Sequence, residues 1–246
     1  MLERIYRRYG SDLRFVAKTC MELAPRKERL EVLDVGCSTG NLIRAFFRHG
    51  GGRADVTGLD IDPGAARNAP SDLRDKIVTG DFLTLDLDRR FDIITMKFLV
   101  EHLLDFNAYV ARARSLLAPG GVLFISTPDI DSPMAVQQGA QWHSLNSQEQ
   151  RIGHIVWFNR ASLYRLAALH GLSVQRCTNR GAFFFHLPLP MQRTLLHILG
   201  REPTSGRVIR SDTLRLLAAA FGDGWLSEKL DYGDSLYAFM TRMETQ

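Results

Sequence analysis

The sequence predicts an α/β protein built on a doubly wound, mostly parallel sheet of seven strands. Two observations lead to this fold class. Short apolar runs alternate with segments of helical apolar spacing, and this alternation is typical of parallel sheets covered by helices. A length of 246 residues, 45% of them hydrophobic, also provides for one sizeable core with room for an appendage.

The strands are expected, in order along the chain, over residues 31–35, 55–60, 76–79, 91–96, 121–127, 172–176 and 235–241. Helices are expected over 41–49, 106–117 and 162–170, because apolar residues recur there at spacings of three and four. The segments 118–121 and 170–171 contain glycine and are expected to end the last two helices. Ligands of such sheets bind where the parallel strands end, so the loops after these strands are the expected site.

Three regions depart from the plain alternation. Residues 1–30 are expected to form an N-terminal helical flap, and residues 31–246 the main domain. Two long segments within it, at about 128–159 and 180–232, are expected to be lids or binding elements. The apolar stretch 181–200 is open to four interpretations: a hydrophobic substrate wall, a dimer face, a lipid-facing patch or packing against the core, which is favoured.

Composition excludes several classes of protein. The net charge of +4 comes from scattered basic residues, so a solvated surface and no nucleic-acid partner are expected. Cys20, Cys37 and Cys177 have neither disulfide-framework nor zinc-site spacing, which favours a reducing cytoplasm. No run approaches the ~18 apolar residues of a membrane span, and no signal peptide is evident. We therefore expect a cytoplasmic monomer or homodimer without stable membrane insertion.

The segment 32–42 has the most informative pattern in the chain. A short apolar strand leads into a turn bracketed by Gly36 and Gly40, and a helix follows. Glycines let the backbone approach a ligand, and the unpaired N–H groups of the helix start point into the same space. Asp34 would repel a pyrophosphate but suits the ammonium group of a methionine-like moiety. The pattern therefore predicts a loop that binds S-adenosylmethionine.

Other interpretations of this loop are disfavoured. Gly36-Cys37-Ser38-Thr39-Gly40 fits the G-x-S-x-G elbow of α/β-hydrolases, but it comes too early in the chain and lacks an upstream oxyanion loop. A nicotinamide site requires G-x-G-x-x-G, and Ser38 replaces the middle glycine. A tight turn without any ligand is the remaining alternative.

Acidic residues also end the next two expected strands. Asp60, followed by Ile61, ends the second strand, where a carboxylate can accept both ribose hydroxyls. Asp81 and Phe82 follow the third strand and suit an adenine amino group and ring. Three acids at three consecutive strand ends are hard to explain as chance surface charge.

From about residue 30 to 178 the chain resembles the class I S-adenosylmethionine-dependent methyltransferases. The segment from Phe91-Asp92 to Glu101-His102 resembles the fourth-strand signature of ubiquinone-biosynthesis and natural-product O-methyltransferases. Small-molecule members of this group are also similar in two further places. These are the passages 116–121 and 125–128, and the pattern Trp142, His154, Phe158, Ser162-Leu163. The resemblance implies a Rossmann-like methyltransferase fold with S-adenosylmethionine as methyl donor and S-adenosylhomocysteine as product.

The resemblance also implies roles for individual residues, listed here by the part of the ligand they contact. The methionine moiety would be held by Asp34 and the loop Gly36, Cys37, Ser38 and Gly40, the ribose by Asp60 with Ile61, the adenine by Asp81 and Phe82, and a backbone contact would come from Lys97. Ser38 replaces a more frequent glycine, and it keeps the loop small. Ubiquinone-type relatives have an E-x-x-E-H cluster for magnesium, whose first acid is Phe98 here, so no metal is expected.

A methyltransferase needs few catalytic side chains, because the sulfonium is already activated. A hydroxyl acceptor needs a base, and histidine suits this role near neutral pH. The candidates are His154, then His143, then His102. The expected reaction is therefore O-methylation of a small molecule such as a secondary metabolite, sugar or phenol. N-methylation of a small amine, or a degenerate methyltransferase fold that only binds, are the alternatives.

Overall fold

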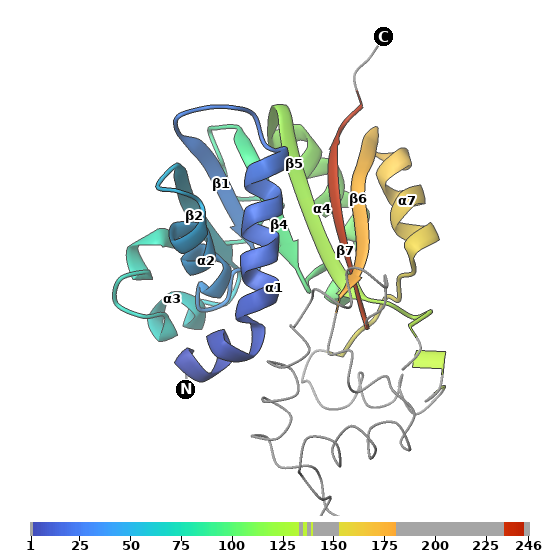
Figure 1. Ribbon diagram of the computed structural model, residues 1–246, viewed down its shortest axis with the longest axis horizontal. Coiled ribbons are helices and arrows are strands. Elements are labelled where there is room, and N and C mark those ends of the chain that lie inside the picture. The colour runs from blue at the N-terminus through green and yellow to red at the C-terminus, as the bar shows by residue number, and fades with distance from the viewer. Residues whose placement is uncertain (1, 133–134, 137–138, 140–152, 181–233, 244–246) are drawn as a thin grey trace, which may run out of the picture.

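The computed structural model describes residues 2–132, 135–136, 139, 153–180 and 234–243, with the backbone alone for 2–11. Its centre is a seven-stranded sheet in the order β3-β2-β1-β4-β5-β7-β6 (Figure 1). The strands are β1 (Leu30–Val35), β2 (Ala54–Asp60), β3 (Ile77–Thr79), β4 (Phe91–Lys97), β5 (Leu117–Pro128), β6 (Leu172–Arg180) and β7 (Ser235–Arg242). Only the pairings of β7 with β5 and β6 are antiparallel, which confirms the predicted fold class.

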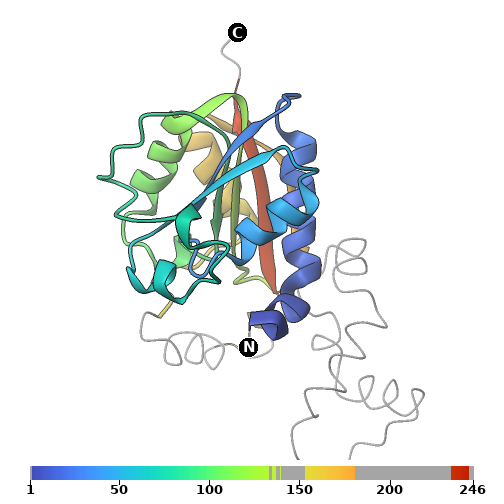
Figure 2. The same cartoon turned by 90° about the vertical axis from the view of Figure 1, so that its left-hand side faces the viewer.

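Helices cover both faces of this sheet (Figure 2). The helices α1 (Leu2–Leu23) and α2 (Asn41–His49) pack on one face, and α4 (Phe106–Leu116) and α7 (Arg160–Leu169) pack on the other. The short helix α3 (Gly64–Asn68) and the 3-10 turns η1 (Arg74–Lys76) and η2 (Val100–His102) lie in the connections. Strands covered on both faces are nearly continuous apolar runs, and β4 is accordingly buried from Phe91 to Met96.

Local sequence signals fix several helix ends. The Asp105 carboxylate accepts a hydrogen bond from the Ala108 N–H at the start of α4. Asn159 and Ser162 form a reciprocal capping box at the start of α7. As predicted, α4 ends just before the segment 118–121. The next strand, expected from residue 121, begins earlier: β5 starts at Leu117, which pairs with Phe91 before a register shift realigns the strands.

The N-terminal helix belongs partly to the core. From Leu13 onward, α1 buries Val16, Ala17 and Cys20 against α2 and the sheet, so this half is a structural layer. The flap predicted for residues 1–30 stays a prediction, because the side chains of residues 1–11 lie outside the described residues. Much of the segment 128–159 and nearly all of 180–232 also lie outside them. Among the described helices, none combines the length and apolar character needed to cross a membrane.

Candidate active site

The loop after β1 has the backbone conformation that its glycines predict. Gly36, Ser38 and Gly40 have φ angles of 72°, 48° and 82°, in the left-handed region. The N–H groups of Gly36 and Cys37 both donate to the Leu59 carbonyl, at 2.8 and 3.2 Å. A Cβ at Gly36 would lie 3.1 Å from Leu99 Cδ1, so this turn has little room for a larger residue.

Asp34 is a buried acid at the base of this loop. Its side chain is only 2% exposed, and its Oδ1 accepts a hydrogen bond of 2.7 Å from Thr95 Oγ1 on β4. Burial raises the pKa of Asp34 to about 7, although the Thr95 hydrogen bond and the Lys97 charge offset part of the increase. A bound cation near Asp34 would stabilise its ionised form.

Asp60 joins the first two loops of the sheet edge. Its Oδ2 accepts a hydrogen bond of 2.7 Å from the Ser38 N–H, and its Oδ1 accepts one of 3.0 Å from the Asp62 N–H. The acid at the end of β2 therefore positions the loop after β1. Beside it, the Ile61 side chain is 69% exposed, an apolar surface at the same edge.

Asp81 and Phe82 lie after β3, in different environments. Asp81 Oδ1 accepts a hydrogen bond of 2.9 Å from the Leu83 N–H. The Phe82 ring is 2% exposed and packs against the Tyr109 ring, with centroids 5.4 Å apart. Most of the Phe82 ring is therefore covered by protein, and Ile61 is the more exposed apolar side chain at this end of the sheet.

Lys97 ends β4, between Asp34 at the end of β1 and Glu101 in the turn that follows β4. Its Nζ lies 4.1 Å from the centroid of the Phe98 ring. Burial lowers the pKa of Lys97, while the nearby acids Asp12, Asp34 and Glu101 act in the opposite direction. Its ammonium thus lies within electrostatic reach of both Asp34 and Glu101.

The turn after β4 brings three titratable side chains together. Glu101 is 1% exposed, and one potential ligand atom from each of Glu101, His102 and His154 lies within 4.8 Å of the other two. The two imidazole centroids are 4.8 Å apart. The Glu101 carbonyl accepts hydrogen bonds of 2.9 and 3.2 Å from the N–H groups of Ile155 and Val156, which attaches the distant segment to this turn. We call these three residues the Glu-His-His cluster.

Burial governs the titration of the cluster. It raises the pKa of Glu101 to about 7 and lowers the pKa of His154 to about 4, where the charge of His102 contributes further. The Thr127 hydroxyl lies near Glu101 and partly offsets the increase, but the two side chains do not reach hydrogen-bonding geometry. At neutral pH the His154 imidazole is therefore uncharged and retains a lone pair.

The structure thus groups His102 with His154, whereas His143 lies outside the described residues.

Sequence reasoning missed two features of the site. Thr95 was counted only as a strand residue, although a polar residue in an otherwise apolar strand is a usable signal and the register pairs it with Asp34. The pairing of Glu101 with His154 has no signal in the sequence spacing.

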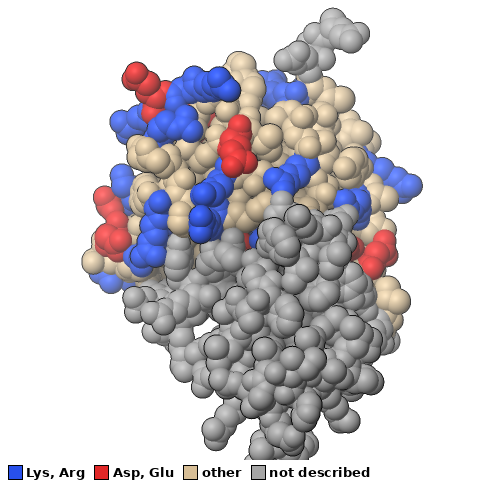
Figure 3. Space-filling model, viewed as in Figure 1, with Lys and Arg blue, Asp and Glu red and all other residues tan. Residues whose placement is uncertain are grey.

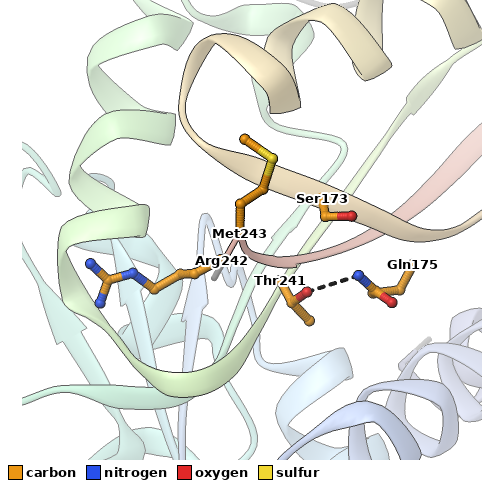
Figure 4. Close-up of a pocket in the computed structure, with 5 residues that line it drawn as sticks. All are labelled: Ser173, Gln175, Thr241, Arg242 and Met243. Carbon is orange, nitrogen blue, oxygen red and sulfur yellow. Dashed lines mark hydrogen bonds between the residues drawn. The ribbon is translucent and has the colours of Figure 1, made fainter. Parts of the chain in front are cut away.

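A depression lies far from these residues, at the amino end of β6 (Figure 4). It is lined by residues at the amino end of β6 and the end of β7, namely Ser173, Gln175, Thr241, Arg242 and Met243. The Gln175 amide donates to Thr241 Oγ1 at 2.9 Å. This is the opposite edge of the sheet from the loop after β1, and the depression contains no acid or histidine.

Basic side chains lie across the face over α1 (Figure 3). Arg14 and Lys18 on α1 and Arg48 on α2 are exposed. Burial lowers the pKa of His49, and these three cations lower it further. The positive charge is thus partly gathered over α1 and α2, away from the Glu-His-His cluster.

Comparison with known proteins identifies the family of the chain. Residues 4–176 match the family model described as "Methyltransferase domain". The ubiquinone biosynthesis O-methyltransferase of Coxiella burnetii is 35% identical over 102 residues, covering 39% of this chain and 42% of that protein. The bifunctional biotin biosynthesis protein BioCD of Bordetella avium is 34% identical over 129 residues, covering 50% of this chain and 25% of that protein. The chain therefore spans less than half the length of these relatives.

Solved structures share the fold at low sequence identity. An S-adenosylmethionine-dependent methyltransferase from Clostridium acetobutylicum has a TM-score of 0.60 and 11% identity, covering 98% of both chains. The [4+2]-cyclase SpnF has a TM-score of 0.59 and 15% identity, covering 94% of this chain and 81% of that one. The fold alone therefore does not decide the reaction. The family model, which covers well over half of the sequence, assigns the chain to the methyltransferase domain family, within the class I S-adenosylmethionine-dependent methyltransferases.

Proposed function

We propose that this protein transfers the methyl group of S-adenosylmethionine to a hydroxyl oxygen of a small molecule. The observation that carries the proposal is the hydrogen bond from the Ser38 N–H to Asp60, which joins the glycine turn and the second strand-end acid. The ubiquinone biosynthesis relatives support oxygen as the acceptor atom.

The residues at the carboxyl edge fit this methyl donor. Asp34 would hold the methionine ammonium, with the turn Gly36–Gly40 beside it, and Asp60 would accept from the ribose hydroxyls. Asp81 would accept from the adenine amino group, and Ile61 would cover the ring in place of the buried Phe82. The backbone of Lys97 would also contact the bound S-adenosylmethionine. When bound, S-adenosylmethionine supplies a methyl group activated by the positive charge on sulfur.

The protein itself must align the acceptor, exclude water and provide for the hydroxyl proton. The Glu-His-His cluster follows directly after β4, next to Lys97, so it lies on the acceptor side of the edge. In a metal-free cluster, His154 is the first candidate base because its neutral imidazole has a lone pair. His102 is the second, and His143 keeps its place as a candidate outside the described residues.

The test begins with calorimetric titration of the purified protein. We expect micromolar binding of S-adenosylmethionine and S-adenosylhomocysteine, and no binding of NADH as the control ligand. Acceptor screening then compares phenols, sugars and small amines, with product formation followed by mass spectrometry. Binding without transfer to any hydroxyl, or transfer to amines alone, would contradict the proposed O-methylation. No binding of either adenosyl ligand would indicate a degenerate fold.

A further inference from the structure

The Glu-His-His cluster has the composition and spacing of a metal site. It offers one carboxylate and two imidazoles, with ligand atoms no more than 4.8 Å apart. Bonds of 2.0–2.2 Å to a central ion would place these atoms about 3–4 Å apart. Small side-chain rotations would therefore bring all three onto one ion.

The cluster also lacks hydrogen-bond partners where burial requires them. Both Glu101 carboxylate oxygens, His102 Nδ1 and His154 Nδ1 are buried without a partner among the described residues. Buried polar atoms are nearly always paired, and several orphaned atoms at one place indicate a missing ion or water. A carboxylate and two ring nitrogens converging on one point favour a cation, because all of these atoms can donate lone pairs to it.

The chemistry of the ligand atoms decides which cation the cluster would prefer, and the cluster offers one carboxylate and two imidazoles. Phe98, which follows Lys97, has no ligand atom. Its ring lies under Lys97 Nζ and in an edge contact with Tyr237, with centroids 6.3 Å apart. Phe98 therefore adds no oxygen ligand, and His154 makes the set nitrogen-rich. Imidazole suits zinc, iron, cobalt and nickel, whereas magnesium prefers a shell of oxygens.

We propose that Glu101, His102 and His154 together bind one divalent transition-metal ion of the zinc type, in preference to magnesium. This proposal revises the expectation of no metal, which counted Glu101 and His102 alone. It deepens the proposed function, on which only its catalytic consequence rests: a bound ion would act as a Lewis acid toward an acceptor oxygen. The two histidines would then be ligands, and the acceptor proton would pass to solvent.

The first experiment measures metal binding directly. Protein stripped with chelator and exchanged into metal-free buffer is titrated with Co²⁺ and followed by its visible absorption, then with Zn²⁺ and Mg²⁺ by calorimetry. We expect one Co²⁺ per chain with the absorption of a nitrogen-ligated site, displacement by Zn²⁺, and much weaker binding of Mg²⁺. Mg²⁺ binding as tight as Zn²⁺ binding, or no stoichiometric Co²⁺ site, would overturn the proposal.

Variants identify the ligands. His154→Gln should weaken Co²⁺ and Zn²⁺ binding by more than about 10-fold. Loss of a metal ligand weakens binding more than loss of a residue that only hydrogen-bonds to a ligand. His49→Gln, at the end of α2 away from the cluster, is the matched control and should bind metal like the wild type. Unchanged metal affinity in His154→Gln would refute the proposal. Circular dichroism establishes that both variants are folded.

A gain-of-function variant tests the selectivity argument. His154→Glu replaces an imidazole with a carboxylate and should raise the Mg²⁺ affinity relative to Zn²⁺, whereas unchanged selectivity would contradict the preference assigned to the two imidazoles. Titration of the metal-free protein with S-adenosylmethionine separates the two proposals. If the metal-free protein binds S-adenosylmethionine but no metal site is found, only the metal proposal fails. If the metal-free protein does not bind S-adenosylmethionine, only the proposed function fails.

Discussion

Two parts of the sheet edge are built in different ways: the ends of β1 and β2, the proposed cofactor half, and the turn after β4 with His154, the proposed acceptor half. At the ends of β1 and β2, the acids are hydrogen-bonded within the protein: Asp34 to Thr95, and Asp60 to Ser38 and Asp62. At the end of β4, Glu101 and the Nδ1 atoms of His102 and His154 are buried without such partners in the part of the chain that the structure describes. The first half is therefore held in place by the protein itself, whereas the second half has polar atoms that a bound ion could satisfy.

The largest expected effect concerns the acceptor half. In metal-free protein, where His154 is the first candidate base, His154→Gln should lower the rate of methyl transfer by about 10²–10⁴-fold, the contribution typical of a positioned proton-transfer group. In metal-loaded protein the same variant removes a ligand of the proposed ion, and its rate then falls together with the metal content. The affinity for S-adenosylmethionine should change little, because His154 belongs to the other half. Single-turnover rates and calorimetry measure the two quantities separately. Equal losses of rate and cofactor affinity would show that the halves are not independent.

Asp60→Ala should act on the cofactor half instead. We expect S-adenosylmethionine binding to weaken by about 1–3 kcal/mol, through lost charge-assisted hydrogen bonds to the ribose and to Ser38. Asp60→Asn is the matched control, since it keeps an acceptor oxygen without the charge, and it should lose less. An unchanged affinity in Asp60→Ala, measured by calorimetry, would disprove the ribose assignment.

Asp34 links cofactor binding to the pH dependence of stability. Its folded-state pKa of about 7 lies above its unfolded value, so the ligand-free fold loses stability as pH rises through 4–7. Asp34→Asn keeps the acceptor for Thr95 and removes this loss. We expect the free energy of unfolding of the variant to exceed that of the wild type by about 1–3 kcal/mol at pH 8, with the difference vanishing toward pH 4.

Denaturant unfolding between pH 4 and pH 8 measures this difference, and calorimetry should show that the same variant binds S-adenosylmethionine more weakly. A constant difference across the pH range would mean that Asp34 is ionised throughout. Improved cofactor binding would contradict the assignment of Asp34 to the methionine ammonium.

The smallest effect is expected at the start of α7, just beyond the segment that contains His154. Asn159→Ala removes one partner of the capping box and should lower the free energy of unfolding by about 0.5–2 kcal/mol. Asn159→Asp is the control, because aspartate caps equally well. The rate of methyl transfer should fall only as far as the lower stability explains. A larger fall would show that the cap also holds the segment containing His154 in place.

Sequence reasoning predicted the cofactor half well in its geometry. The predicted glycine turn follows the first strand, with positive φ angles at Gly36 and Gly40, and Asp34 and Asp60 lie at the predicted strand ends. It did not predict that the Phe82 ring would be covered by Tyr109, because burial depends on how α4 packs against the third loop. The start of β5 was misjudged for a similar reason, since pairing with Phe91 extended the strand into an expected turn.

The sequence by itself determined the fold class and the glycine turn after β1, because both depend on short-range patterns: apolar periodicity, glycines in a turn and acids that end strands. Only the tertiary structure decided the Glu-His-His cluster. Glu101 and His154 lie more than fifty residues apart, and they meet because two backbone N–H groups bind the Glu101 carbonyl. A contact of this kind arises from packing between distant segments, and no local pattern in the sequence encodes it.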